Sequence, residues 1–182
     1  MFYNKSNVSY EERGIMKEIF ERRSIRKYTD APVSDADIEK LLRAAMQAPS
    51  AVNQQPWEFA VLKDKDLMQK VLEFHPYSTP LKTAACAIVV CMKQPLNAML
   101  KPYHMQDCAA ATQNILLEAT HLGLGTVWMG VYPDEARVNG VRELIQAPEE
   151  ITPFCIIAVG YPAEQPAPAD RYDAARVHVN KW

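Results

Sequence analysis

Hydrophobic positions along the chain recur with two periods, which together predict both helices and strands. Apolar side chains three or four positions apart, between capping residues and prolines or glycines, are typical of helices. Short β-favouring or continuous apolar runs between turn residues are typical of strands. The helices expected on this basis cover residues 9–20, 34–49, 64–74, 105–122 and 133–145. The expected strands cover residues 57–62, 85–92, 126–129 and 152–159.

Two of these elements indicate where the interior lies. Residues 85–92 form an uninterrupted apolar run, as expected of a central strand that is buried on both faces. The helix over 105–122 is apolar and alanine-rich nearly all round, so we expect it to be buried either in the domain core or against a partner. Together the elements predict an α+β domain.

The length and composition of the chain favour one globular domain over residues 1–182. A chain of 182 residues, 48% of them hydrophobic, can bury one core. Its longest apolar run, Ala84–Met92, is too short to span a bilayer, and residues 1–7 lack the pattern of a signal peptide. We therefore expect a cytoplasmic protein without a membrane partner. Residues 163–182 cannot bury themselves, and this arm is expected to pack on a partner subunit.

Charge and cysteine usage exclude two further classes of protein. A net charge of −2 and a pI near 6.1 argue against a nucleic-acid-binding protein. The cysteines lie in apolar surroundings without a CxxC pair, which predicts reduced, buried thiols and no metal site. They are Cys86, Cys91, Cys108 and Cys155. His104 and Cys108 lie four positions apart, and we interpret this pair as structural.

A cluster of cations follows the first predicted helix. Residues 22–27 read Arg-Arg-Ser-Ile-Arg-Lys, which suits an anion, because guanidinium groups match phosphate oxygens and a serine hydroxyl completes the contact. If Arg22 and Arg26 share the last helical turn, an anion between them would relieve their repulsion. A solvated basic face is the alternative interpretation.

A second polar segment, residues 48–57, contains Asn53, Gln54 and Gln55 between two prolines that stiffen it. Side-chain amides offer both donors and acceptors, so this loop suits a polar heterocycle. The two segments together predict sites for a phosphate and a ring.

No catalytic motif accompanies these segments. Neither a Ser-His-Asp or Cys-His spacing nor a carboxylate pair placed for acid–base chemistry stands out in the sequence. Residues 123–125 read Gly-Leu-Gly but follow a helix and precede a strand, which is not the context of a dinucleotide fingerprint. The pattern favours a protein whose cofactor carries the reaction.

Four segments, residues 22–28, 49–57, 123–130 and 157–162, resemble in order the motifs of the nitroreductase family of flavoenzymes. The match spans nearly the whole chain. The resemblance implies an α+β fold with a mixed central sheet flanked by helices, in an intertwined homodimer with two FMN molecules at its interface. It also implies an oxidoreductase that uses NAD(P)H to reduce nitroaromatic, quinone or related small electron acceptors by ping-pong hydride transfer at flavin N5.

The resemblance also assigns residues to the FMN. The segment at the phosphate, the ribityl chain and the pyrimidine edge matches Arg22, Arg23, Ser24 and Arg26. The loop at the isoalloxazine, partly from the other subunit, matches Pro49, Ser50, Ala51, Asn53 and Gln55. Met129 and Gly130 match the pair whose backbone approaches N5, and Arg171 matches a C-terminal cation at the phosphate, with Arg176 as the alternative.

Two features leave the function open at this point. Many family members have another side chain where Met129 stands, and only residues 93–103 are available for a lid. The alternatives are a non-catalytic binder of flavin or of a phosphorylated ligand, and a specialised enzyme of the same fold, such as a dehalogenase or a flavin-fragmenting enzyme.

Overall fold

The structure is a computed structural model that describes residues 14–94, 98–167 and 169–182. Its α-helices are α1 (Lys17–Glu21), α2 (Asp35–Met46), α3 (Lys65–Lys70), α4 (His104–His121) and α5 (Glu135–Leu144). Its strands are β1 (Trp57–Leu62), β2 (Cys86–Lys93), β3 (Gly125–Gly130) and β4 (Ile151–Gly160). These elements confirm the predicted α+β class. The helix expected over 9–20 begins outside the described residues, and α1 is its described part.

The four strands form one sheet in the order β1-β2-β4-β3, in which all neighbouring strands are antiparallel. The expectation of a mixed sheet needs correction, because in the described part of the chain parallel pairing is limited to a bridge between Ser24 and Thr126. The physical reason is the connection through α4. It leaves β2 and β3 running in the same direction but one strand position apart, and β4 fills that position antiparallel to both.

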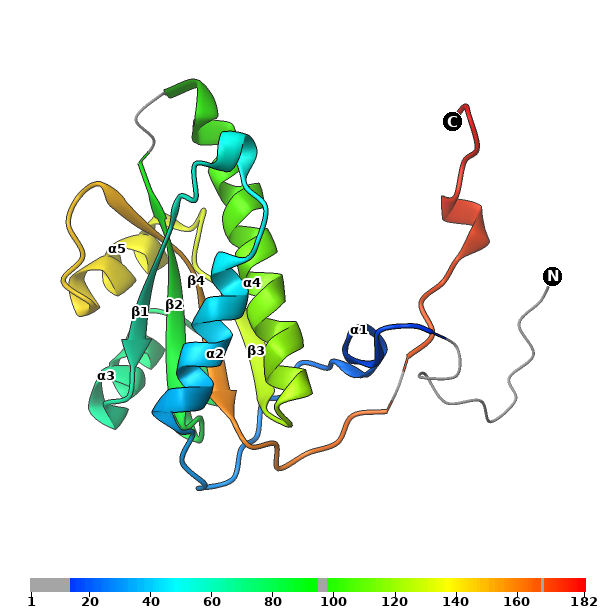
Figure 1. The fold of residues 1–182 in the computed structure, drawn as a ribbon. Helices are drawn as coiled ribbons and strands as arrows, with labels where there is room; N and C mark the ends of the chain where they lie inside the picture. The colour runs from blue at the N-terminus through cyan, green and yellow to red at the C-terminus, as the bar shows by residue number, and fades with distance from the viewer. Residues whose placement is uncertain (1–13, 95–97, 168) are drawn as a thin grey trace.

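Helices cover both faces of the sheet (Figure 1). α2 and α4 pack on one face, in a buried cluster that includes Leu41 and Ile115. α3 and α5 pack on the other face, in a cluster that includes Met68 and Val141. Because β2 and β4 contribute side chains to both clusters, the prediction that residues 85–92 form a central strand is confirmed.

The domain core accounts for only one face of α4. Side chains such as Cys108 and Ile115 are fully buried under the sheet. Away from the sheet Met105 is 42% exposed, Ala109 and Leu117 are only half-buried, and two glutamines are exposed among them. The helix therefore keeps some apolar side chains that the described chain covers only in part, on a face that also carries polar residues.

Side-chain caps determine where three of the helices begin. Ser34, Asp64 and Asp134 each accept hydrogen bonds from backbone amides in the first turn of α2, α3 and α5 respectively. The caps at Ser34 and Asp64 agree with the sequence prediction. The cap at Asp134 fixes the first turn of α5, which carries Arg137.

The remaining structural expectations concern membranes, metals and thiols. Among the described helices, none is long and apolar enough to cross a membrane. The described residues contain no group of three or more His, Cys, Asp or Glu side chains that could hold a metal ion. All four cysteines are free and buried, and burial raises their pKa, to about 11 for Cys86 and about 12 for Cys155. The prediction of reduced, buried thiols is therefore consistent with the structure.

The packing of α5 generates a prediction about Gly140. Glycine inside a helix usually destabilises it by about 1 kcal/mol relative to alanine. An added Cβ at Gly140, however, would lie 2.7 Å from Cγ of the Phe74 ring. We therefore expect Gly140→Ala to lower the free energy of unfolding by about 1 to 3 kcal/mol, the usual cost of overpacking. Urea denaturation followed by circular dichroism measures this change.

Asn139→Ala is the matched control, because Asn139 is an exposed neighbour on the same helix. It should leave the free energy of unfolding within about 0.5 kcal/mol of the parent value. If Gly140→Ala were more stable than the parent chain, the contact with Phe74 would not limit this position.

Candidate functional site

The cationic segment leaves α1 and runs extended beside β3. Arg22, directly after α1, has φ −52° and ψ 127°, which ends the helix. The backbone N–H of Ile25 then donates to the carbonyl of Thr126 at 2.9 Å. Because the segment is extended, Arg22 and Arg26 do not share a helical turn, so the condition for placing one anion between them is not met. The two arginines instead line two different cavities.

Gly125 permits this close approach of the two segments. A Cβ at Gly125 would lie 2.8 Å from Cβ of Ile25, so any larger residue would displace the cationic segment from β3. The glycine that ends the Gly-Leu-Gly sequence therefore has a packing role.

The first cavity lies between the cationic segment, the end of α4 and the start of the C-terminal arm, and we call it the arm cavity. It has a volume of about 460 Å³. Its lining includes Glu21, Arg22, Arg23, Gly125, Glu164 and Ala167. Burial, and then repulsion from the nearby charges of Arg171 and Arg23, lowers the pKa of Arg22. Within the described residues Arg22 has no ion pair or side-chain hydrogen bond, so its charge is available for an anion.

Arg23 holds the arm in place. Its Nε donates to the carbonyl of Ala167 at 3.1 Å, and its Nη1 donates to the carbonyl of Phe20 at 3.0 Å. Its Nη2 is buried and, in the part of the chain that the structure describes, lacks a hydrogen-bond partner. Only this one nitrogen of Arg23 thus remains for a ligand.

The two candidate arginines of the arm differ in their surroundings. Arg176 forms an ion pair with Asp173 at 3.2 Å, three positions away. Arg171 lies close enough to Arg22 for its charge to lower the pKa of that guanidinium. Of the two, Arg171 therefore joins Arg22 in the cationic cluster.

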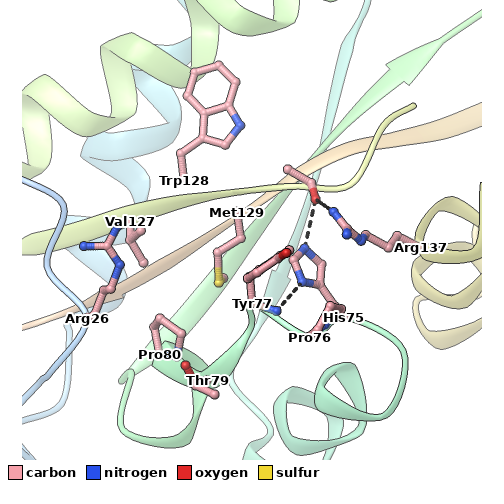
Figure 2. A pocket seen from close by; sticks show the side chains of 11 residues that line it. Arg26, His75, Pro76, Tyr77, Thr79, Pro80, Val127, Trp128, Met129 and Arg137 are labelled. Carbon is pink, nitrogen blue, oxygen red and sulfur yellow. Dashed lines mark hydrogen bonds between the residues drawn. The ribbon is translucent and has the colours of Figure 1, made fainter. Parts of the chain in front are cut away.

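The second cavity lies at the free edge of β3, and we call it the edge cavity (Figure 2). It has a volume of about 440 Å³. Its lining includes Arg26, His75, Tyr77, Met129, Gly130 and Arg137. β3 pairs with β4 along one side. On its other side the cationic segment pairs with it at Thr126, and beyond that point the edge presents backbone donors and acceptors to this cavity.

The backbone of β3 distinguishes Gly130 from Met129. Amide and carbonyl groups of alternate residues in a strand point to the same edge. The carbonyl of Thr126 points to the free edge, where it accepts from Ile25, so those of Trp128 and Gly130 do too. Of the predicted pair, Gly130 therefore directs its amide at the cavity. A Cβ at Gly130 would meet no atom within 4 Å, so packing within the described chain does not require glycine here.

The polar loop at residues 50–55 has an unusual backbone. Val52, Asn53 and Gln55 have φ angles of 47°, 56° and 48°, a conformation that is uncommon for residues other than glycine and costs free energy. Inside the loop, Ser50 Oγ accepts from the backbone N–H of Gln55 at 3.0 Å. The side chain of Gln55 donates to Asn53 Oδ1 at 2.9 Å. Val52 is nonetheless 79% exposed, so the loop does not bury its own apolar side chain.

Two buried residues of α4 hold this loop. Asp107 accepts from the backbone N–H of Ala51 at 3.1 Å and from Gln54 Nε2 at 3.0 Å. His104 Nε2 lies 3.1 Å from Gln54 Oε1, and burial lowers the pKa of the His104 ring. The interpretation of His104 as structural agrees with this contact. Sequence reasoning missed Asp107, although an acidic residue within an apolar helix is a usable signal.

The two predicted halves of the site do not meet within one chain. The polar loop packs on the first turn of α4, whereas α1 contacts its last residue, where Glu18 Oε1 lies 2.9 Å from His121 Nδ1. These two contacts, at Asp107 and His121, lie 14 residues apart on α4, or about 21 Å along its axis. The loop also precedes β1, at the opposite edge of the sheet from β3, about 14 Å across three strand spacings. Figure 1 shows this separation.

Comparison with known proteins identifies the family. The model of the nitroreductase family matches residues 19–75 and 75–161, and the chain belongs to this family. The prediction made from the four motifs is thereby confirmed.

Several relatives and solved structures are similar to this chain over most of their own length. A protein of Methanothermobacter thermautotrophicus, provisionally named NADH dehydrogenase/NAD(P)H nitroreductase, is 47% identical over 168 residues, which are 92% of this chain and 87% of the relative. The structure of a provisionally named NADH oxidase from Clostridium acetobutylicum is 47% identical, with a TM-score of 0.85 over 91% of this chain and 100% of that one. An FMN-dependent nitroreductase from Clostridium difficile is 30% identical, with a TM-score of 0.84 over 92% and 100%.

Proposed function

We propose that this chain is an FMN-dependent oxidoreductase that uses NAD(P)H to reduce nitroaromatic, quinone or related small electron acceptors by a ping-pong reaction. The observation that carries the proposal is the line of groups along the free edge of β3. Arg22 lines the arm cavity at the start of the strand, where the charge of Arg171 also acts on it, and Arg26 and Gly130 line the edge cavity towards its end. The six residues of β3 span about 20 Å, a length that suits a nucleotide-sized ligand. Membership of the family and the similarity to an FMN-dependent nitroreductase support FMN as that ligand.

The residues fit the separate parts of FMN. Arg22 and Arg171 would hold the phosphate, because a dianion relieves the repulsion that the charge of the exposed Arg171 exerts on the partly buried guanidinium of Arg22. The hydroxyl of Ser24 lies in the same segment and would complete that contact. Arg26 would meet the pyrimidine edge, where its positive charge stabilises negative charge on the ring. When bound, FMN supplies the hydride acceptor and donor for the reaction, and the protein positions it.

The separation of the two halves within one chain supports a homodimer. In a twofold arrangement the loop with Ser50, Asn53 and Gln55 would come from the partner subunit and meet a ring held by Arg26 and Gly130. Apolar surface is available for such an interface on three elements: the partly covered face of α4, α1 and the arm. The exposed apolar side chains on or next to these three elements include Met16, Ile19, Met105, Tyr172, Val179 and Trp182. Four free, buried cysteines support a reducing, cytoplasmic location.

The cofactor itself tests the function. Purified protein should be yellow and contain about one FMN per subunit, because each chain has one set of candidate FMN-binding groups along β3. Anaerobic NADH or NADPH should bleach the visible absorption of the flavin, and a nitroaromatic or quinone should restore it. Colourless protein that causes no change in FMN fluorescence on titration would contradict the proposal and favour a plain anion-binding protein.

Arg22→Ala tests the phosphate contact. Losing a charge-assisted hydrogen bond costs about 1.5 to 3 kcal/mol, so we expect FMN to bind about ten- to a hundredfold more weakly. Riboflavin lacks the phosphate and should bind the variant and the parent chain equally. Fluorescence titration gives both dissociation constants.

Arg176→Ala is the control, because Arg176 is an exposed arginine of the same arm that pairs with Asp173. It should change neither affinity by more than about twofold. If Arg22→Ala weakened riboflavin as much as FMN, Arg22 would act on the ring or on the fold, and its assignment to the phosphate would be wrong.

Deletion of residues 172–182 tests the role of the arm in the dimer. This change keeps Arg171 and removes the exposed side chains of Tyr172, Val177, Val179 and Trp182. We expect light scattering to show a dimer of the parent chain at micromolar concentration. The dimer of the shortened chain should have a higher dissociation constant, and it should retain less FMN. A folded, monomeric parent chain at that concentration would refute the dimer.

A further inference from the structure

Two side chains converge on the backbone carbonyl of Gly130. His75 Nε2 lies 2.9 Å from this oxygen, and Arg137 Nη1 donates to it at 3.3 Å. Dashed lines in Figure 2 mark these hydrogen bonds, and both side chains line the edge cavity. His75 comes from the segment after α3, and Arg137 comes from α5. Two separate elements thus fix one carbonyl at the end of β3.

The protonation of His75 follows from its second hydrogen bond. The backbone N–H of Tyr77 donates to His75 Nδ1 at 3.3 Å, so Nδ1 must accept and carries no proton. The ring is only 1% exposed, and burial, with a smaller contribution from the charge of Arg137, lowers its pKa. A neutral ring has one N–H, which here is at Nε2 and points at Gly130.

Arg137 is held in place from two further directions. Its Nε lies 3.4 Å from Oδ2 of Asp134, the residue that caps α5. Its guanidinium carbon lies 5.4 Å from the centre of the Tyr77 ring, in a cation–π contact. The Tyr77 ring also lines the cavity, although Tyr77 is 70% exposed. The cation is therefore both oriented and close to the free edge of β3.

These contacts matter because Gly130 is the last residue of β3 and has no side chain. A glycine at a strand end is the backbone position that keeps the most conformational freedom. In a strand, the amide and carbonyl of one residue point to the same edge. Two donors on the carbonyl therefore favour the extended conformation of Gly130, in which its amide also points to the cavity.

We propose that His75 and Arg137 are positioning residues, which hold Gly130 so that its amide N–H meets the flavin ring in the edge cavity. This inference rests on the proposed function and adds two residues to the site. It also assigns Arg137 an electrostatic effect, because its positive charge at the ring favours the reduced, more negative form of the flavin.

Arg137→Gln tests the proposal, with Arg142→Gln as the matched control. Arg142 lies on the same helix and also donates to a backbone carbonyl, that of Ile151 at 3.2 Å, but it does not line the cavity. For Arg137→Gln we expect FMN and riboflavin to bind about five- to tenfold more weakly by the same factor, because the lost contact acts at the ring. The affinity for reduced relative to oxidised FMN should fall by about tenfold, which makes the two-electron reduction potential about 30 mV more negative. Arg142→Gln should change neither quantity.

Substitution of His75 separates positioning from folding. His75→Leu removes the donor, and thermal unfolding by circular dichroism shows whether that variant still folds. His75→Gln keeps an N–H near the position of Nε2 and should bind FMN within about threefold of the parent chain. If His75→Leu folds, it should bind both FMN and riboflavin at least tenfold more weakly.

The outcomes distinguish the two proposals. If the parent chain does not bind FMN, the proposed function fails. If the parent binds FMN but Arg137→Gln has the parent's affinities and reduction potential, the function stands and the positioning role is wrong. An effect of Arg137→Gln on FMN alone would place Arg137 at the phosphate and overturn the proposal as well.

Discussion

The candidate site depends on the contact between the cationic segment and β3. The hydrogen bond from the amide of Ile25 to the carbonyl of Thr126 fixes the position of Arg22 and Arg26 along the strand. Gly125 makes this contact possible, because a side chain there would overlap Ile25. With the segment in this place, one arginine lines the arm cavity and the other the edge cavity. Cations that read as one cluster in the sequence are thus divided between two cavities along the strand.

Whereas the contact with β3 positions the cationic segment, α4 separates the polar loop from α1, which precedes that segment. His104 and Asp107 hold the loop at the first turn, and His121 contacts α1 at the last. The loop lies about 21 Å along α4 from the α1 contact and about 14 Å across the sheet from β3, and this separation supports the proposal that a second copy of the chain completes the site. The partly covered apolar side chains of α4 and the exposed arm offer such a copy a surface.

Much of this could be predicted from the sequence, and the failures have physical reasons. The strand over 85–92 is evident because burial on both faces makes it uniformly apolar, and Ser34 and Asp64 mark helix starts by local hydrogen bonds. The antiparallel pairing of the sheet and the extended course of Arg22 to Arg26 depend on contacts between segments distant in sequence. His75 and Arg137 were not recognised for the same reason, because they meet only at Gly130.

In the polar loop, contacts between segments distant in sequence stabilise an unfavourable backbone conformation. Val52, Asn53 and Gln55 adopt positive φ angles, each of which costs roughly 1 to 3 kcal/mol unless the surroundings enforce it. The buried carboxylate of Asp107 enforces it through two hydrogen bonds. The loop is therefore ordered when the chain folds and not when a ligand binds, so binding does not have to supply the ordering free energy. The hydrogen bonds from His75 and Arg137 to Gly130 are similar in effect. They hold the carbonyl of a glycine whose backbone could otherwise adopt other conformations.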